Sequence, residues 1–481
     1  MSEQPATPSM FARGRFQLTR RFGLTRAVVN SVLARVWSVI AGPISLACVA
    51  RFLSREEQGF YYTIWSVLGL QIVFELGFSF VIAQFASHER ANLQRVDGKM
   101  TGDVRSHQRL ASLLRLSVKW YCAAGLFMIV VLLPAGFLFF THYSRGSGVH
   151  WTWPWILVAA LTACNLMLIP FAALLEGAGQ IEDVSMMRLL QLVTTNVMVW
   201  ICLVAGARLY AAVVLSGTMA LFAACWLAIR HRALFLDLWR ASTEAHPIDW
   251  RAEVWPFQWR MAVSWVSGYI IFQLFNPILF AARGAAEAAQ MGMSLMVVIS
   301  ISTFATAWIN ARAVDYGALI AQRRFRELDG IFLASLWQSI GAMSLLSAGF
   351  LVAVMLLRAI HHPFAERLLS PLPLILLIAG TVLNHVFVAE AAYLRAFKRE
   401  PFMGLTLVLA TLSVGGSLLV AKPYGALGIA SVFVVVMAVV AAGGGTAIFL
   451  SSRRRWRSGQ IDFVEEPLIP DTRGVGDSPA G

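Results

Sequence analysis

Residues 50–84 read ARFLSREEQGFYYTIWSVLGLQIVFELGFSFVIAQ, and this stretch decides the fold. A short charged turn at 51–59 leads into a long apolar segment that carries Gln71 and Glu75 in its middle. The apolar segment before the turn carries Arg35. An ionised side chain at bilayer depth is costly unless it faces a cavity or a partner. The two segments therefore predict a pair of membrane helices that line a polar path.

The composition places the chain among membrane proteins. Hydrophobic residues make up 58% of the 481 and charged residues 14%, and the mean hydropathy is +0.68. These values exclude a single soluble domain and are typical of a polytopic membrane protein. The five cysteines lie inside apolar runs without a CxxC pair, so we expect neither a disulfide framework nor a metal site.

Signatures of soluble enzymes are missing from the sequence. We find no phosphate-binding GxxxxGK[ST], no HExxH, no GxSxG and no metal-type cluster of Cys and His. We therefore predict that the protein is not an enzyme, has no catalytic residues and needs no cofactor.

Apolar runs long enough to cross a bilayer recur along the whole chain. A spanning helix needs about 20 mostly apolar residues, and about twelve runs satisfy this condition. The sequence thus predicts an all-α polytopic membrane protein. The predicted spans are 28–50, 60–84, 117–140, 153–175, 187–207, 210–229, 257–282, 291–313, 331–357, 370–392, 402–421 and 424–450.

The basic residues predict the orientation of these spans. With twelve spans, 30 lysines and arginines fall in the segments on the side of the N-terminus and 8 on the opposite side. Cytoplasmic loops carry the excess of positive charge in membrane proteins. We therefore expect a multi-pass inner-membrane protein with both termini in the cytoplasm. The net charge of +13 is then a sign of topology and not of nucleic-acid binding.

The chain divides into two similar halves. The Ala-Arg pair at 50–51 is followed seven positions later by Gln58, and the pair at 282–283 is followed likewise by Gln290. Such recurrence, at an offset of about 220 to 230 residues, predicts two six-helix bundles around a central cavity, as in many transporters. The predicted parts are a basic cytoplasmic N-terminus (1–27), an N-terminal bundle (28–229), a cytoplasmic loop (230–256), a C-terminal bundle (257–450) and a disordered cytoplasmic tail (451–481).

Polar residues on the first two spans are the main candidates for a substrate site. Gln71, Glu75 and Ser79 share a face of the second span, and the first span has a polar stripe of its own. In a hydrophilic lumen Arg35 would attract an anionic headgroup, and Glu75 would pair with it or bind a coupling proton or cation. The alternative is a buried bridge between Arg35 and Glu75 that only locks the two helices together. The stripe of the first span consists of Ser31, Arg35, Ser38, Gly42 and Ser45.

The second half supplies four further candidates for the substrate cavity. Asn276 precedes Pro277 in the seventh span, where the proline makes either a hinge or a static kink. Asn310 belongs to a polar stripe on the eighth span, and Arg312 closes the cytoplasmic end of that span or extends to the interface. His385 on the tenth span is either a proton relay or a hydrogen-bonded packing residue.

Several segments are similar to segments of one known family. Their order and spacing, from about residue 25 to about 455, resemble the bacterial polysaccharide exporters and O-antigen-type flippases of the multidrug, oligosaccharidyl-lipid and polysaccharide (MOP) transporter superfamily. The segments are ARFLSREEQGFY (50–61), FELGF (74–78), LEGAGQ (175–180), WPFQWR (255–260), QMGMSL (290–295) and YLRAFKREPF (393–402).

This resemblance implies a fold like that of the multidrug (MATE) branch, with twelve to fourteen helices in two bundles that form a V around a central cavity. It also implies that a lipid-linked glycan moves from the cytoplasmic to the outer leaflet. Members of the family often have cavity arginines that meet the phosphate groups of the substrate, and Arg35 fits that role. The implied partners are a polyprenyl-(pyro)phosphate-linked glycan and the lipid bilayer, with a glycan polymerase or assembly proteins as further candidates.

Four functions remain open from the sequence, and the last of them is a non-transporting scaffold within an envelope-assembly complex. The leading hypothesis is a flippase for a lipid-linked oligosaccharide or polysaccharide repeat unit that works by alternating access. The second is an ion-coupled antiporter of small solutes or drugs with the same fold, for which Glu75 would supply the coupling carboxylate. The third is a membrane-embedded glycan polymerase or ligase, which the short connections on the outer side disfavour.

Overall fold

The structure is a computed structural model, and it describes residues 26–96, 98–144, 147–242, 248–397 and 401–457. Nearly all of these residues are helical, as the sequence predicts. Residues 1–25 of the basic N-terminus and residues 458–481 of the tail lie outside the described residues, so the expectations for them stay predictions.

The first half of the chain, residues 26–240, forms what we call the N-lobe. It contains one β-hairpin, in which Leu93 pairs with Gly102 and Val96 with Lys99. Its elements are α2 (Arg26–Phe52), α3 (Arg55–Gly69), α4 (Gln71–Glu75), α5 (Phe78–Arg90), β1 (Leu93–Val96), β2 (Lys99–Gly102), α6 (Val104–Tyr143), α7 (Thr152–Gly177), α8 (Ile181–Val204), α9 (Tyr210–Arg230) and α10 (Arg232–Arg240).

The second half, residues 248–457, forms the C-lobe. Its elements are the π-helical turn η1 (Trp250–Val254), α11 (Trp255–Gln273), α12 (Phe275–Arg283), α13 (Ala285–Ala321), α14 (Phe325–Ala359), the 3₁₀ turn η2 (Pro363–Arg367), α15 (Pro371–Arg395), α16 (Met403–Val436), the π-helical segment η3 (Met437–Gly445) and α17 (Thr446–Arg457).

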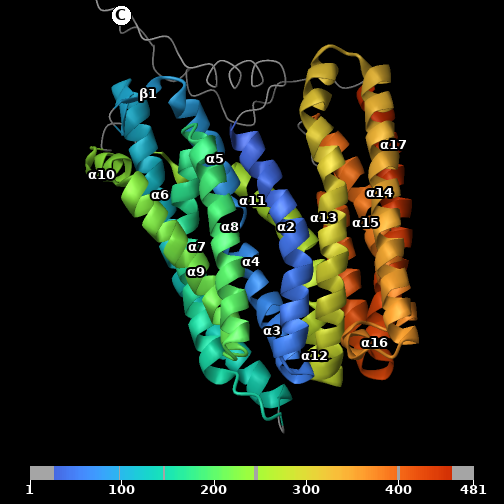
Figure 1. Ribbon diagram of the computed structural model, residues 1–481. Helices are drawn as coiled ribbons and strands as arrows, with labels where there is room; N and C mark the ends of the chain where they lie inside the picture. The colour runs from blue at the N-terminus through green and yellow to red at the C-terminus, as the bar shows by residue number, and fades with distance from the viewer. Residues whose placement is uncertain (1–25, 97, 145–146, 243–247, 398–400, 458–481) are drawn as a thin grey trace, which may run out of the picture.

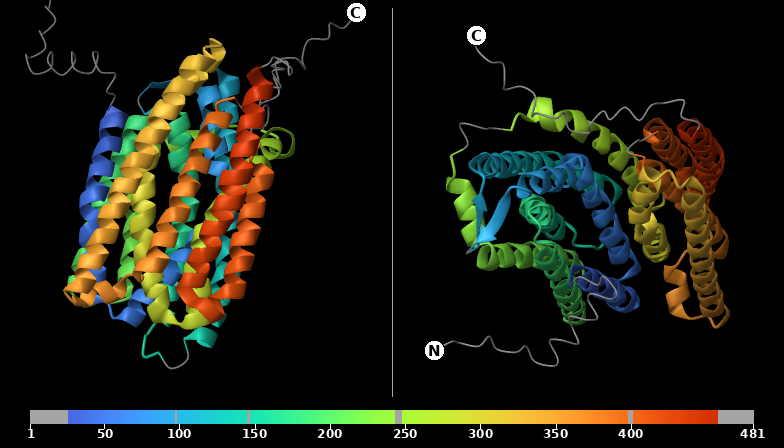
Figure 2. Two further views of the ribbon diagram at one scale, coloured as in Figure 1. Left: turned by 90° about the vertical axis from the view of Figure 1, so that its right-hand side faces the viewer. Right: turned by 90° about the horizontal axis from the view of Figure 1, so that it is seen from above.

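The long helices of both lobes run in one general direction and stand side by side (Figure 1). Seen along the helices, the N-lobe and the C-lobe occupy two separate sides of the molecule (Figure 2). We call the upper end in Figure 1 the basic end, and it carries Arg26, the β-hairpin and α10. The opposite end carries the connections that follow α2, α6, α8, α12 and α14.

The number of membrane crossings agrees with the sequence once two irregular spans are considered. Ten helices of the described residues are long and apolar enough to cross a membrane, and a bent pair of helices, Arg55–Glu75 and Phe78–Arg90, adds an eleventh span. The longest run, Met403–Trp456, has 54 residues and contains a non-helical residue, Gly425, after Pro423. An α-helix of that length would extend about 80 Å, far beyond a bilayer core of about 30 Å. The run therefore folds back at Gly425 and provides two crossings, which brings the total to twelve.

The second span differs from the expected continuous helix over 60–84. It is interrupted at Leu70 and again after Glu75, and the two parts meet at an angle of 43°. At the second break both Leu76 and Gly77 have positive φ values, 53° and 65°. A helix cannot continue through left-handed residues, so this break places Glu75 at the end of a helix and not in the middle of one.

The charged turn between the first two spans begins α3 in the way its sequence indicates. The Ser54 side chain accepts a hydrogen bond from Glu57 N (3.1 Å), and Ser54 N donates to the Glu57 carboxylate (2.8 Å). This reciprocal capping box satisfies backbone donors that a helix start leaves open. It fixes the direction in which α3 leaves the opposite end.

The two lobes touch most closely at the opposite end. A side chain on Gly59 of α3 would overlap the carbonyl oxygen of Ala285 in α13, and one on Gly292 of α13 would overlap the ring of Tyr62 in α3. Phe60 of α3 also meets Phe280 of α12 edge to face, with ring centroids 4.9 Å apart. Glycines thus let the backbones of the two lobes approach each other closely at this end.

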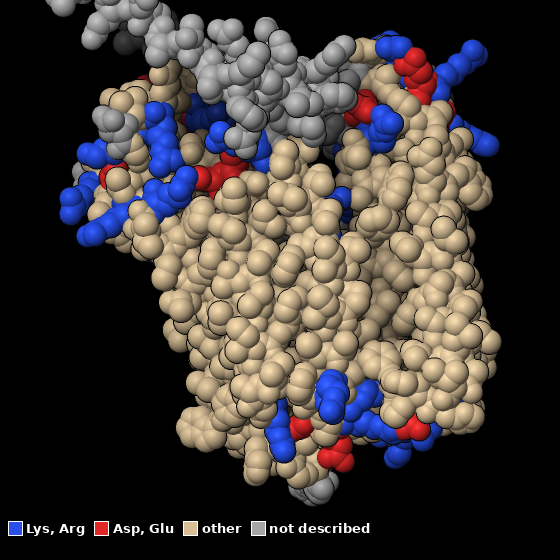
Figure 3. Space-filling view, in the orientation of Figure 1, with Lys and Arg blue, Asp and Glu red and all other residues tan. Residues whose placement is uncertain are grey.

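The charged residues are concentrated at the two ends of the molecule. In the space-filling view an uncharged band covers the middle, and lysines and arginines gather at the basic end, with fewer at the opposite end (Figure 3).

The basic end also holds a buried histidine, His231, which is 1% exposed. Its Nε2 lies 3.3 Å from Asp183 Oδ2, and its Nδ1 lies 3.5 Å from Arg95 Nη2. Burial, together with the positive charge of Arg95, lowers the pKa of His231 below its ordinary value, although Asp183 acts in the other direction.

The glycine contact between the lobes leads to a stability prediction. We expect Gly59→Ala to lower the apparent melting temperature of the purified protein by several degrees, because overpacking of a closed contact costs about 1–3 kcal/mol. Gly42→Ala is the matched control, since no atom lies within 4 Å of a Cβ at that position on α2. Equal melting temperatures of the two variants would contradict the close contact.

The lowered pKa of His231 leads to a prediction about pH. As the pH falls below about 6.5, the unfolded chain takes up a proton at this histidine while the folded protein keeps it neutral, so stability is lost. The loss continues until the pH passes the pKa of the folded state. Melting temperatures between about pH 7.5 and about pH 5 should fall less steeply for His231→Gln than for the wild type. The exposed His88 provides the control, because His88→Gln should keep the slope of the wild type.

Candidate substrate groove

A groove lies between the two lobes on the face shown in Figure 3. The surface is hollowed there between α2 and α14, and α13 lies at the floor of the hollow (Figures 1 and 3). The hollow is at the height of the uncharged band. It therefore opens sideways, toward the region that lipid would occupy.

Arg35 lies on the face of α2 that is turned toward the C-lobe. The other face of α2 packs on α8, where Asn30 Nδ2 donates to Ser185 Oγ (3.1 Å). Trp37 also contacts Trp200 on that side, with ring centroids 6.0 Å apart. Arg35 lies about 140° to 160° around the helix from Asn30 and Trp37. Figures 1 and 2 show α8 on one side of α2 and α13 on the other. Residue 35 is therefore on the side of α2 that faces the groove.

The Arg35 side chain is exposed and has no hydrogen bond or ion pair with any residue that the structure describes. The bridge to Glu75 that the sequence left open is therefore not formed between these residues. Arg35 lies about 14 Å along the axis of α2 from Arg26, at the basic end. An unpaired cation at such a depth needs water or an anionic ligand beside it.

The floor of the groove is a polar stripe of α13. Gly292, Thr303 and Asn310 share one face of this helix, because spacings of 11 and 7 residues are close to three and two full turns. Gly292 touches the N-lobe through Tyr62, whereas Thr303 and Asn310 are exposed. The face that closes against the N-lobe at the opposite end is thus uncovered toward the basic end.

Arg35 and Thr303 lie at similar depth in the groove. Thr303 is about 27 Å along α13 from Ala285, and Arg35 is about 26 Å along α2 from Phe52. Asn310 is about 10 Å nearer to the basic end than Thr303. The groove therefore presents a cation on one wall and hydroxyl and amide groups on its floor.

Arg312 is on another side of α13. It follows Asn310 by two residues, and residues two apart do not share a helix face. Its guanidinium lies 3.6 Å from the Asp315 carboxylate, and both side chains are about half exposed. The structure thus does not bring Arg312 together with Arg35 and Asn310.

Glu75 belongs to the interior of the N-lobe. Its Oε1 accepts hydrogen bonds from Ser79 Oγ (2.5 Å) and Tyr121 Oη (3.3 Å). Tyr121 comes from α6 and stacks on Phe78, with ring centroids 6.0 Å apart. Glu75 and Ser79 were expected to share a helix face, and they remain in contact across the break at Leu76. The carboxylate is half-buried, as is Gln71 at the start of α4.

Asn276 and His385 are buried and outside the groove. Asn276 is 4% exposed, and its Nδ2 donates to Ser66 Oγ of the N-lobe (3.0 Å), so it links the lobes. His385 is 1% exposed inside the C-lobe, with Nε2 2.8 Å from Ser339 Oγ and Nδ1 3.4 Å from Thr306 Oγ1. The structure thus places these two residues at packing contacts between helices.

A polar link at the opposite end closes the groove. Arg367 of η2 donates from Nη1 to Leu53 O and to Gln58 Oε1, both at 2.9 Å. Gln58 is fully buried, and its Nε2 donates to Met293 Sδ (3.4 Å). The oxygen and the nitrogen of the Gln58 amide thus both contact residues of the C-lobe.

The sequence analysis did not identify Arg367 as a functional residue. Its contact residue Gln58 is 309 positions away, and no local pattern connects them. Tyr121 was missed as well, although a hydroxyl in an apolar run is a signal that could have drawn attention to it. Arg55 and Glu366 form an ion pair between the lobes at the same end.

Comparisons with known proteins establish the fold. The structure aligns with a transporter of the MOP superfamily from Pyrococcus furiosus at 14% identity and a TM-score of 0.57, over 90% of this chain and 95% of that one. It aligns with the lipid II flippase MurJ in an inward closed conformation at 12% identity and a TM-score of 0.55, over 89% of this chain and 87% of that one. An inward-facing MATE family multidrug resistance transporter aligns at 16% identity and a TM-score of 0.51, over 86% of this chain and 99% of that one.

These similarities support the predicted all-α, MATE-like fold of a multi-pass membrane protein. The identities are too low to show more than the fold. No family model matches the sequence, and no curated protein matches it either.

The link at the opposite end leads to a further prediction. We expect Arg367→Ala to speed hydrogen exchange of the backbone amides at 53–62 by about tenfold, because the buried Gln58 amide loses its donor, at a cost of about 1–3 kcal/mol. Lys422→Ala serves as the control, since Lys422 is exposed on the C-lobe. Unchanged exchange in Arg367→Ala would show that this link does not hold the lobes together.

Proposed function

We propose that the protein is a flippase that moves a lipid-linked oligosaccharide or polysaccharide repeat unit across the bacterial inner membrane. In this proposal the basic end faces the cytoplasm, as the excess of lysine and arginine indicates. The substrate enters from the cytoplasmic leaflet and leaves toward the outer leaflet.

The observation that carries the proposal is the unpaired Arg35 on the wall of a groove that opens sideways. A lipid-linked substrate has a charged phosphate group between a sugar and a long apolar tail. The groove offers a guanidinium for the phosphate and the polar groups of Thr303 and Asn310 for the sugar. Its side opening lets the tail remain in lipid. A guanidinium is well suited to this task because its planar fork binds phosphate with two hydrogen bonds.

The contacts between the lobes support alternating access. The lobes are held together at the opposite end by the Gln58–Arg367 link and by the glycine contacts, whereas the facing stripe of α13 is exposed toward the basic end. The described conformation thus corresponds to a state open to the cytoplasm. Transport requires a second state in which the opposite end opens, and the substrate drives the change only if it binds the two states with different affinity.

The second candidate function is an ion-coupled antiporter of small solutes or drugs. Glu75 favours it, because this carboxylate accepts two hydrogen bonds and forms no ion pair with a described residue. Arg35 opposes it for organic cations, which a guanidinium repels. A glycan polymerase or ligase is less well supported, since the connections described at the opposite end are short and the structural neighbours are transporters.

The flippase proposal is tested on the lipid-linked glycan pool of cells depleted of the protein. Complete repeat units should accumulate on the cytoplasmic leaflet, where a membrane-impermeant reagent added from outside does not reach them. An unchanged pool would refute the proposal and favour the antiporter, which is then tested by drug or solute efflux.

The groove also yields a prediction for Arg35. In vesicles that contain the purified protein, Arg35→Ala should reduce translocation of a polyprenyl-diphosphate glycan by about tenfold or more, because a charge-assisted hydrogen bond to phosphate contributes about 1.5–3 kcal/mol. Its melting temperature should stay unchanged, since Arg35 has no protein partner among the described residues. Arg51→Ala, which removes an exposed arginine at the other end of α2, should translocate normally. A wild-type rate for Arg35→Ala would refute the assignment.

A further inference from the structure

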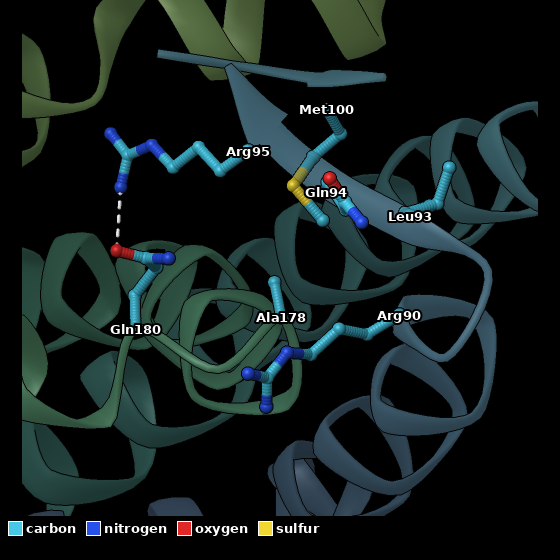
Figure 4. Close-up of a pocket in the computed structure, with 7 residues that line it drawn as sticks. All are labelled: Arg90, Leu93, Gln94, Arg95, Met100, Ala178 and Gln180. Carbon is cyan, nitrogen blue, oxygen red and sulfur yellow. Dashed lines mark hydrogen bonds between the residues drawn. The ribbon is translucent and has the colours of Figure 1, made fainter. Parts of the chain in front are cut away.

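A second basic site lies at the basic end of the N-lobe, away from the groove. A partly open pocket of about 250 Å³ is lined there by the C-terminus of α5, by the β-hairpin and by the turn between α7 and α8 (Figure 4). Leu93, Met100 and Ala178 give it a buried apolar base. Its polar residues are Arg90, Gln94, Arg95 and Gln180, and none of the residues that line it is acidic.

The turn that forms one wall is rigid. Gln180 N donates to Leu175 O (2.8 Å), and Gly179 N donates to Glu176 O (3.1 Å), so α7 ends in a Schellman motif. Gly179 has the left-handed conformation that this motif requires, with φ of 82°. The LEGAGQ segment (175–180) thus holds Gln180 in a fixed position.

Arg95 is held in place by two contacts. Its Nη1 donates to Gln180 Oε1 (2.7 Å), and its Nη2 lies 3.5 Å from His231 Nδ1. Since the Gln180 oxygen is engaged by Arg95, its amide nitrogen points toward Ala178 and Met100 (Figure 4). The pocket therefore has a positioned amide donor beside a positioned positive charge.

Arg90 brings a second guanidinium to the same turn. Its side chain extends beneath Ala178, while that of Arg95 extends above, so the two guanidinium groups flank the turn (Figure 4). The Arg90 guanidinium lies against Gly179, where any side chain would overlap it. Arg90 forms no hydrogen bond or ion pair with a described residue. Its donors are therefore available to a ligand.

The pocket lies at the level of lipid headgroups. Three membrane helices end around it, α5 at Arg90, α7 at Gly177 and α8 at Ile181. Nearby, Ile229 at the end of α9 is 84% exposed and Trp239 on α10 is 48% exposed, as expected for side chains that meet lipid at the interface. A phosphate attached to a lipid can thus reach the pocket from the membrane.

We propose that this pocket binds a phosphate group, with Arg90 and the Gln180 amide as its donors and Arg95 as the second positive charge. Arginine forks, an amide donor and the absence of a lining carboxylate together fit a phosphate. The phosphate comes from an anionic phospholipid, from a polyprenyl diphosphate or from solution. The site is separate from the groove and does not depend on the proposed transport.

The test measures binding to the full-length protein in detergent by native mass spectrometry. The probes are phosphatidylglycerol, undecaprenyl diphosphate and inorganic phosphate, and phosphatidylcholine is the zwitterionic reference. Arg90→Gln should weaken binding by about tenfold, because one charge-assisted contact is lost. Arg240→Gln, which removes an exposed arginine of α10 outside the pocket, should bind as the wild type does.

A second variant adds charge to the pocket. Gln94 is exposed on β1, and Gln94→Glu should weaken binding through repulsion without removing an internal hydrogen bond that the structure describes. The probe whose binding is weakened by both Arg90→Gln and Gln94→Glu identifies the source of the phosphate. The proposal is overturned if no probe distinguishes Arg90→Gln from Arg240→Gln, or if phosphatidylcholine binds as tightly as the anionic probes.

Discussion

The structure depends on the contact of α3 with α13 at the opposite end. Gly59 and Gly292 bring the two backbones together, and the Gln58–Arg367 link closes the same region with partly buried hydrogen bonds. Apolar surface contributes little to association between membrane helices, because lipid is as apolar as the side chains. Close backbone approach and satisfied polar groups must therefore supply the contact between the lobes. Where these stop, the lobes separate and the groove begins.

The two charged residues of the first two spans lie in different environments, one in the groove and the other in the interior of the N-lobe. Arg35 faces the groove without a protein partner among the described residues. Glu75, in contrast, accepts hydrogen bonds from Ser79 and Tyr121 inside the N-lobe. If the two formed a bridge, the charge of Arg35 would be neutralised and the groove would offer little to an anion. Their separation leaves the arginine free for a ligand and gives the carboxylate an environment of hydroxyl groups.

The sequence predicts the number and type of the helices well, because each crossing requires a long apolar run. It does not predict the direction of each side chain, since this depends on which neighbour covers a helix. Arg35 illustrates the difficulty, because only the packing of α8 shows which face of α2 is free. Arg312 is a different case, since its two-residue separation from Asn310 already places it on another side. The Gln58–Arg367 link joins distant segments, so no local pattern predicts it.

The break in the second span has a mechanical consequence. α3 packs chiefly on α13 and α12 of the C-lobe, whereas α5 packs chiefly on α7 and α6 of the N-lobe. One membrane span is thus shared between two bodies, and the residues between Gly69 and Phe78 form the joint. Any rotation of the lobes that keeps both sets of contacts must be absorbed by these few residues. The left-handed Leu76 and Gly77 lie in this joint, and Glu75 directly precedes them. The carboxylate therefore lies directly beside the residues that set the angle between the two parts of the span.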